Sequence, residues 1–161
     1  MAYNPNNQFL AALAAGGKNA LDGGLIYLFA GSVPADANAA LDMAATHTQV
    51  AILSLGGDGS TGLTFDSPTD GALIKPAVAD WSGLVAFDGA QNGETTLTPT
   101  FFRFCATGDN GRSAGTGPRL QGTVGGPSSA ANMKLLTSTL TANGSNTTSS
   151  DSFRLDLLPT G

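Results

Sequence analysis

Short apolar runs separated by glycine-rich turns dominate the chain from residue 25 onward. The clearest are the bulky run 25–29, which is bounded by glycine, and the alternating segments 50–55 and 101–105. The turns between them are rich in Gly, Asp, Asn and Ser, as in Gly56-Gly57-Asp58-Gly59. Short strands with frequent turn signals are typical of sandwiches and barrels. The pattern predicts a mainly β chain that folds as a single-domain antiparallel β-sandwich or barrel with an N-terminal helix and arm.

The hydrophobic pattern predicts nine strands, at 25–30, 47–55, 62–66, 72–75, 83–87, 95–105, 119–124, 133–140 and 152–158. Successive side chains of a strand point to opposite faces of a sheet. We therefore expect Phe102 and Phe104 to lie on the core face. Phe101, Arg103 and Cys105 then share the other face, and Arg103 is expected to point toward solvent or a partner subunit.

The N-terminal segment has a different pattern. Its apolar residues recur at roughly helical spacing, at Phe9, Leu10, Leu13, Ala14 and Leu21. This spacing predicts a helix over 7–22 that ends at two glycines, preceded by an Asn/Pro-rich arm with one aromatic residue, Tyr3. Such a helix is too weak to be stable alone and gains order by docking. We therefore divide the chain into an attachment element, 1–22, and a β-sandwich domain, 23–161.

Charge is scarce. Charged residues make up 12% of the chain, about half the usual share, and the net charge is −5. The low charge fits a surface that neighbouring molecules cover. The seven basic residues are scattered, so no basic stripe indicates direct binding of nucleic acid. The apolar run 9–15 is too short for a membrane span or a convincing signal peptide, so we expect synthesis in the cytoplasm and no membrane partner.

One segment matches a catalytic pattern. Gly111-Arg112-Ser113-Ala114-Gly115 fits Gly-x-Ser-x-Gly, but a nucleophile elbow needs a strand before the serine and a helix after it. Here turn residues lie on both sides, and the single histidine, His47, has no second feature that supports a role as base. We therefore expect Arg112 and Ser113 to lie in a mobile or contact loop without catalytic function, and we do not expect an enzyme.

Metal and sugar sites have equally little support. One histidine and one cysteine cannot build a zinc site, and the spacing of Asp58, Asp66, Asp70 and Asp80 does not fit a calcium loop. Those aspartates are expected to form turns, and no cofactor is expected. Cys105 is interpreted as a small buried hydrophobic residue. The single tryptophan, Trp81, is either a core residue or, in a lectin-like module, a residue on which a sugar stacks.

The order of several short motifs resembles a family of phage proteins. A strand, turn and alanine-rich helical turn occupy 23–41. They are followed by Phe101-Phe102-Arg103-Phe104 with a Gly-Asp-Asn-Gly turn, by Gln121-Gly122-Thr123-Val124-Gly125-Gly126, and by a closing strand at 151–159. Roughly over residues 20–160, this order is similar to that in capsid decoration (cement) and minor virion proteins of tailed bacteriophages.

The resemblance implies a structural protein on the head surface of the virion. Its partner would be the major capsid protein, bound across neighbouring subunits, and the protein would be a homo-oligomer, with a trimer as one option. The capsid-contact candidates are Tyr3, Phe9, Leu10, Leu13, Arg103 and Arg112. Two alternatives stay open, which are a phage tail or fibre component that binds host glycans, and a hydrolase that uses Ser113 or His47.

Overall fold

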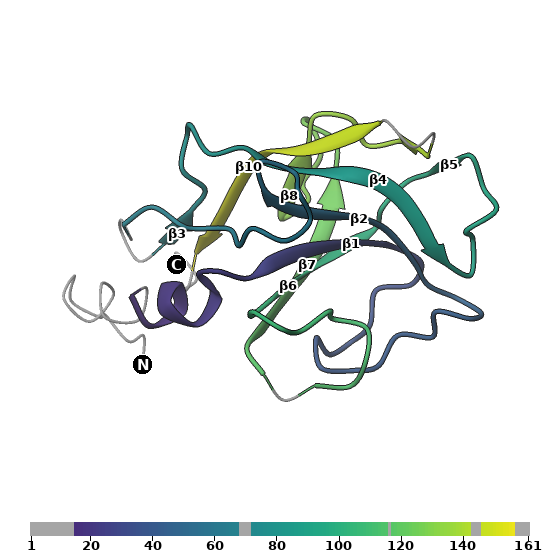
Figure 1. Cartoon of the computed structure of the whole chain (residues 1–161), viewed down its shortest axis with the longest axis horizontal. Helices are drawn as coiled ribbons and strands as arrows, with labels where there is room; N and C mark the ends of the chain where they lie inside the picture. The colour runs from purple at the N-terminus through teal and green to yellow at the C-terminus, as the bar shows by residue number, and fades with distance from the viewer. Residues whose placement is uncertain (1–14, 68–71, 116, 143–145, 157–161) are drawn as a thin grey trace.

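The computed structural model describes residues 15–67, 72–115, 117–142 and 146–156 (Figure 1). Residues 15–21 are helical, and the rest of the regular structure is β. The strands are β1 Leu25–Ala30, β2 Thr48–Leu55, β3 Ala72–Ile74, β4 Trp81–Gly89, β5 Thr96–Leu97, β6 Phe101–Cys105, β7 Arg119–Gly125, β8 Met133–Leu135, β9 Leu140–Thr141 and β10 Thr147–Asp156.

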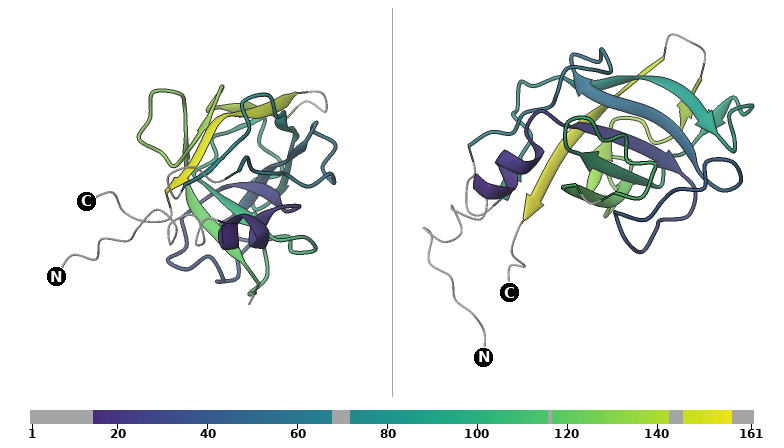
Figure 2. Two further views of the ribbon diagram at one scale, coloured as in Figure 1. Left: turned by 90° about the vertical axis from the view of Figure 1, so that its left-hand side faces the viewer. Right: turned by 60° about the horizontal axis from the view of Figure 1, so that its bottom comes forward.

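Seven of these strands close into a barrel, in the order β10-β4-β2-β1-β6-β7-β8. The last strand closes the ring, because β10 pairs with β4 through Thr147–Ser149 and then with β8 through Ser150–Phe153. The pairs are antiparallel except β7 and β8, which run parallel. Beyond the barrel, the end of β10 pairs with β3, while β5 and β9 form a separate small sheet. Figure 2 shows β10 bending across the other strands.

The predicted mainly β fold is confirmed and most predicted strands are present, but four of them differ from the prediction. The closing strand β10 begins at Thr147, five residues before the predicted start at 152. Residues 62–66 are not a strand. The Phe65 backbone N–H donates to the Asp22 side chain and not to the carbonyl of a neighbouring strand. The segment 95–105 is two strands, separated around Pro99, which has no N–H for a sheet ladder. The segment 133–140 is likewise divided into β8 and β9.

The helix ends inside the barrel domain. Leu21 is buried in the main core, and the Asp22 carboxylate oxygen Oδ1 accepts the Phe65 N–H at 3.0 Å. The helical residues 15–21 fall within the predicted helix 7–22, of which residues 7–14 lie outside the described part of the chain. Deletion of the whole predicted attachment element, 1–22, would therefore also remove the contacts that Leu21 and Asp22 make with the barrel domain.

The barrel interior is filled by aromatic side chains. Trp81 is fully buried, and its ring centroid lies 5.4 Å from that of Phe65, 5.6 Å from that of Phe153 and 6.1 Å from that of Phe104. The predicted core role of Trp81 is confirmed, and the alternative of an exposed sugar-stacking residue is wrong. Phe102 and Phe104 also lie in this core, as the alternation of β6 predicts.

The outer face of β1 and β6 is covered as well. A second apolar cluster consists of Tyr27, Phe29, Leu41, Phe101 and Cys105. Leu41 comes from the loop between β1 and β2, and a Cβ placed on Gly111, in the loop after β6, would lie 3.0 Å from the Cys105 sulfur. Both loops therefore fold back over this face of the barrel. Burial raises the pKa of the Cys105 thiol to about 12, which fits its predicted role as a small apolar residue.

Replacing Phe104 with Ala should lower the free energy of unfolding by about 3–5 kcal/mol, because the change empties a large aromatic site in the barrel core. Urea unfolding of both proteins measures the loss. Leu136→Ala is the control, since Leu136 is 60% exposed and should change stability by less than about 0.5 kcal/mol. Equal effects of the two substitutions would contradict this assignment of the core.

Candidate functional site

Arg103 is fully buried, so the prediction that it faces solvent or a partner is wrong. Its guanidinium Nη1 donates to the carbonyl oxygens of Ala39 at 2.8 Å and Gly111 at 2.6 Å. Nη2 donates to the carbonyl of Asp36 at 3.2 Å, and Nε to Oε1 of Gln121 at 3.0 Å. Alternation along β6 correctly places Arg103 outside the barrel core. The two surface loops then cover it, and their carbonyl oxygens replace water as acceptors.

Two further side chains hold the same loops. Arg119 Nη1 donates to the carbonyls of Ala37 at 3.2 Å and Ser113 at 2.9 Å, and Gln121 Nε2 donates to the carbonyl of Pro34 at 2.6 Å. We call Arg103, Arg119 and Gln121 the carbonyl clamp. Because all three extend from β6 and β7, they fix the segment 34–39 across these strands through its backbone.

An ion pair anchors the clamp. Arg119 donates from Nε and Nη2 to the two carboxylate oxygens of Asp109, at 2.5 and 2.7 Å. These hydrogen bonds hold the pKa of Asp109 below its ordinary value of 3.8. Burial, together with the nearby Arg119 charge, lowers the pKa of Arg103. The clamp therefore contains two cations, Arg103 and Arg119, and the Asp109 carboxylate binds the second of them.

Arg112, the other basic contact candidate, is partly exposed. Its guanidinium donates to Oε1 of Gln49 from Nη2 at 2.9 Å and from Nε at 3.2 Å, and it pairs with Asp88 at 2.6 Å. Arg112 thus connects the loop after β6 to the outer side of β2 and β4. The remaining contact candidates, Tyr3, Phe9, Leu10 and Leu13, lie outside the described residues.

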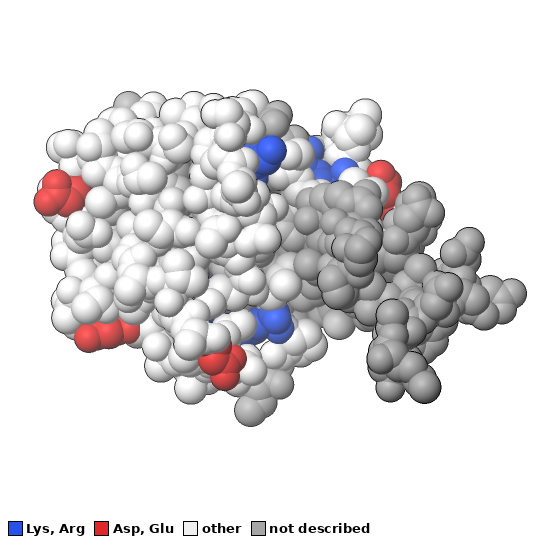
Figure 3. All heavy atoms as spheres, turned by 180° about the vertical axis from the view of Figure 1, so that it is seen from behind, with Lys and Arg blue, Asp and Glu red and all other residues white. Residues whose placement is uncertain are grey.

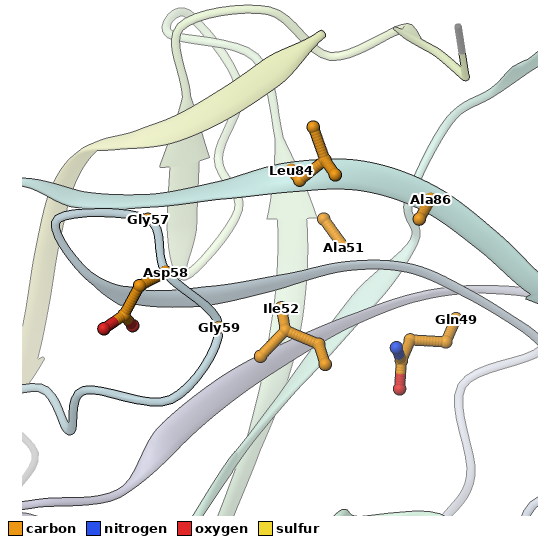
Figure 4. Close-up of a pocket in the computed structure, with 8 residues that line it drawn as sticks. All are labelled: Gln49, Ala51, Ile52, Gly57, Asp58, Gly59, Leu84 and Ala86. Carbon is orange, nitrogen blue, oxygen red and sulfur yellow. The ribbon is translucent and has the colours of Figure 1, made fainter. Parts of the chain in front are cut away.

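Gln49 marks one end of a groove of about 300 Å³ on the outer side of β2 and β4 (Figure 4). The groove is lined by Gln49, Ala51, Ile52, Gly57, Asp58, Gly59, Leu84 and Ala86. The pairing of β2 with β4 is irregular between Gln49 and Ala51, and that of β1 with β2 is irregular between Leu28 and Phe29. Bulges bend a sheet and redirect side chains. The residues that line the groove include several small ones, which leave the surface hollow beside these bulges.

The turn at the other end of the groove is fixed by side chains. The Asp58 carboxylate accepts the backbone N–H groups of Ser60 at 2.8 Å and Thr61 at 2.7 Å, and these bonds, with one from the Thr61 hydroxyl, lower its pKa. Ser54 Oγ accepts the N–H of Gly59 at 2.8 Å. Gly57 has a φ of 76°, and a Cβ there would lie 2.8 Å from Ser82 Oγ, so the close approach of this turn to β4 requires glycine.

Beside the groove lies a set of uncharged residues on β4, on β10 and just after β8. Leu84 is paired with Thr147 and Ser82 with Ser149, and the Leu136 N–H donates to the Ser149 carbonyl. We call the following residues the neutral face: Ile52, Ser82, Leu84, Ala86, Leu136, Thr147 and Ser149. Four large hydrophobic side chains are exposed in the described part of the chain, and two of them, Leu84 and Leu136, lie on this face. The two leucines lie on either side of β10, and apolar side chains gathered on one exposed face mark contact surfaces more often than isolated ones do.

Low charge extends beyond this face. Figure 3 shows the side of the molecule opposite to that in Figure 1, where most of the described surface is formed by uncharged residues. The segment 120–150 has one charged residue, Lys134. Interface cores are depleted in charged residues, so this distribution is compatible with extensive protein contact.

Ser113 and His47, the two residues weighed for catalysis, have different surroundings. Ser113 is exposed in a loop, and the His47 ring nitrogens bond to the Thr46 hydroxyl at 2.8 Å and the Ser32 carbonyl at 3.0 Å. Residues 111–115 are not followed by the helix that a nucleophile elbow needs.

Within the described ranges, no three His, Cys, Asp or Glu side chains gather where a metal ion could bind. No helix in the part of the chain that the structure describes is long and apolar enough to cross a membrane. Asp70, one of the aspartates weighed for calcium, lies outside that part.

Comparison with known proteins finds no matching family model, no similar curated protein and no similar solved structure. A function for this chain is therefore argued from its surface and from the motifs in its sequence.

Replacing Arg103 with Ala should lower the free energy of unfolding by about 3 kcal/mol or more. The change removes a buried cation and leaves the carbonyls of Asp36, Ala39 and Gly111 without their donor. Urea unfolding gives the loss, and hydrogen exchange should show faster exchange in the loops than in the barrel strands. Arg112→Ala is the matched control and should cost less, because Arg112 is partly exposed. A larger loss for Arg112→Ala would contradict the clamp.

The stability that Asp109 contributes should depend on pH. Its folded-state pKa lies below the ordinary 3.8, so the contribution is complete above that value and is lost as pH falls through the folded-state pKa. We expect the difference in free energy of unfolding between wild type and Asp109→Asn to shrink as pH falls from about 5 toward 2. Urea titrations over this range measure it, and a difference that grows on acidification would refute the assignment.

Proposed function

We propose that this chain is a structural virion protein that decorates and stabilises a bacteriophage capsid by binding across neighbouring major capsid subunits. The observation that carries the proposal is the neutral face, where Leu84 and Leu136 are exposed among hydroxyl and small side chains. The order of motifs that resembles phage decoration proteins supports the same function. The proposed location is the head surface, after synthesis in the host cytoplasm.

Stabilisation of a shell needs no catalytic chemistry. A protein that contacts two capsid subunits at once links them, because separating the subunits then also breaks its contacts. The neutral face can supply such contacts by burying aliphatic side chains without removing a charge from water. The paired strands of the barrel would keep the contact surface in one conformation, which reduces the entropy lost on binding. A homo-oligomer, with a trimer as one option, would multiply these contacts.

The glycan-binding alternative has less support. Sugar rings stack on exposed aromatic side chains, and in the described residues the aromatic rings are buried, except for the half-exposed Phe87. The exposed surface instead offers Leu84, Leu136 and many Ser and Thr side chains. That composition suits contact with another protein better than it suits a sugar-binding platform.

The location and copy number in purified virions test the proposal. Quantitative mass spectrometry against the major capsid protein should find the chain at a high, fixed ratio in particles and in tail-free heads. A handful of copies confined to tails would favour the tail alternative, and absence from purified particles would overturn the proposal.

Leu84→Lys and Leu136→Lys should each reduce occupancy on heads about tenfold or more, because each substitution places a charge in the contact. Heads that lack the protein are mixed with each purified variant, and bound protein is counted after sedimentation. The control is Val78→Lys, which alters an exposed apolar side chain outside the neutral face. Unchanged binding of both leucine variants would show that another surface makes the contact.

A further inference from the structure

We propose that Asn92-Gly93 is a site of spontaneous deamidation in the folded protein, whereas the chemically equivalent Asn110-Gly111 is protected by the carbonyl clamp. This inference is independent of the proposed function. Both pairs consist of the same two residues with different flanking residues, so comparison of the folded and unfolded chain separates the effect of structure from that of sequence.

The reaction needs only the chain and water. The backbone nitrogen of the glycine attacks the side-chain carbonyl carbon of the asparagine, a C–N bond forms, and the amide nitrogen leaves as ammonia. Water then opens the five-membered imide at either carbonyl, which gives aspartate or isoaspartate. Glycine favours the attack because it has no side chain to hinder ring closure. The glycine N–H must lose its proton, and both residues must be able to rotate into the reactive geometry.

Asn92-Gly93 meets these requirements. The pair lies in the turn after β4, and both residues are exposed. The Asn92 N–H donates to the Gly89 carbonyl at 3.2 Å, but in the described structure neither the Asn92 side chain nor the Gly93 N–H has a hydrogen-bond partner. A Cβ placed on Gly93 would meet nothing within 4 Å, so the backbone has room to move.

Asn110-Gly111 is held at every group that must react or move. The Gly111 N–H donates to Asp109 Oδ1 at 2.9 Å, and the Gly111 carbonyl accepts from Arg103 at 2.6 Å. Asn110 Oδ1 accepts the Arg112 N–H at 3.0 Å. Deprotonating the Gly111 nitrogen would break its hydrogen bond and place negative charge beside the Asp109 carboxylate. Reaction at Asn110 therefore requires the clamp to open first.

The product changes the molecule where charge is scarce. Conversion of Asn92 to an acid takes the net charge from −5 to −6 and places the new carboxylate two residues from Glu94. Isoaspartate also adds a methylene to the backbone of this turn. The folded protein would thus deamidate at Asn92 while the carbonyl clamp stays intact.

The test compares the two sites within one protein. The full chain is incubated at mildly alkaline pH, folded in buffer or unfolded in urea, and peptide mass spectrometry follows each Asn-Gly pair over time. In the folded protein Asn92 should react about tenfold or more faster than Asn110, and in urea the two rates should be similar. The third pair, Asn143-Gly144, lies outside the described residues and is quantified separately. Asp109→Ala should accelerate the reaction at Asn110, toward its rate in urea.

Equal rates at the two sites in the folded protein, or a faster reaction at Asn110, would overturn the proposal. Gly93→Ala is the matched control and should slow reaction at Asn92 without affecting Asn110. If Asp109→Ala fails to fold, as circular dichroism would show, the folded and urea rates of the wild-type protein still decide the result.

Discussion

The structure depends on a buried cation, Arg103, whose hydrogen-bond acceptors are all uncharged. The Arg103 guanidinium is removed from water, and its acceptors are three backbone carbonyls and one side-chain amide oxygen. Removing a charge from water is costly unless its hydrogen-bonding groups are satisfied. The two loops therefore have to adopt the conformation that presents those carbonyls. In this way one side chain determines the shape of segments that have no regular secondary structure.

One outer face of the barrel is covered by loops and another is exposed. The clamped loops cover the outer face of β1 and β6, with the second apolar cluster beneath them. The outer face of β4 and β10 has no such cover, and Leu84 and Leu136 are exposed on it. The loops thus bury aromatic side chains on one side of the barrel, while Leu84 and Leu136 are left accessible on another. A decoration protein would need this combination of a rigid body and an uncharged contact surface.

Much of the barrel could be predicted from the sequence, because its signals are local. The run 25–29 and the alternation in 101–105 correspond to β1 and β6, and the face assignment of Phe102 and Phe104 is confirmed. The environment of Arg103 could not be predicted in this way. Its acceptors lie on loops up to 67 residues away, and alternation shows only which face a side chain takes, not whether a loop covers that face.

The candidate site was predictable only in part. Trp81, Gly83 and Val85 are buried along β4, so alternation places Leu84 on the outside. The part of the neutral face that lies on β4 could therefore be predicted from the sequence. The groove beside it depends on two irregular strand pairings and on the approach of Gly57 to Ser82. Those features arise when distant segments meet, and no local pattern indicates them.

Closure of the barrel by its last strand has a consequence for biosynthesis. Until residues 147–156 have left the ribosome, β4 and β8 are the two open edges of an unfinished sheet. Their unpaired backbone groups can join to another nascent chain as readily as to β10. Pairing of residues 147–156 with both edges therefore protects the chain from aggregation, and a chain that ends before this strand would be released with both edges exposed.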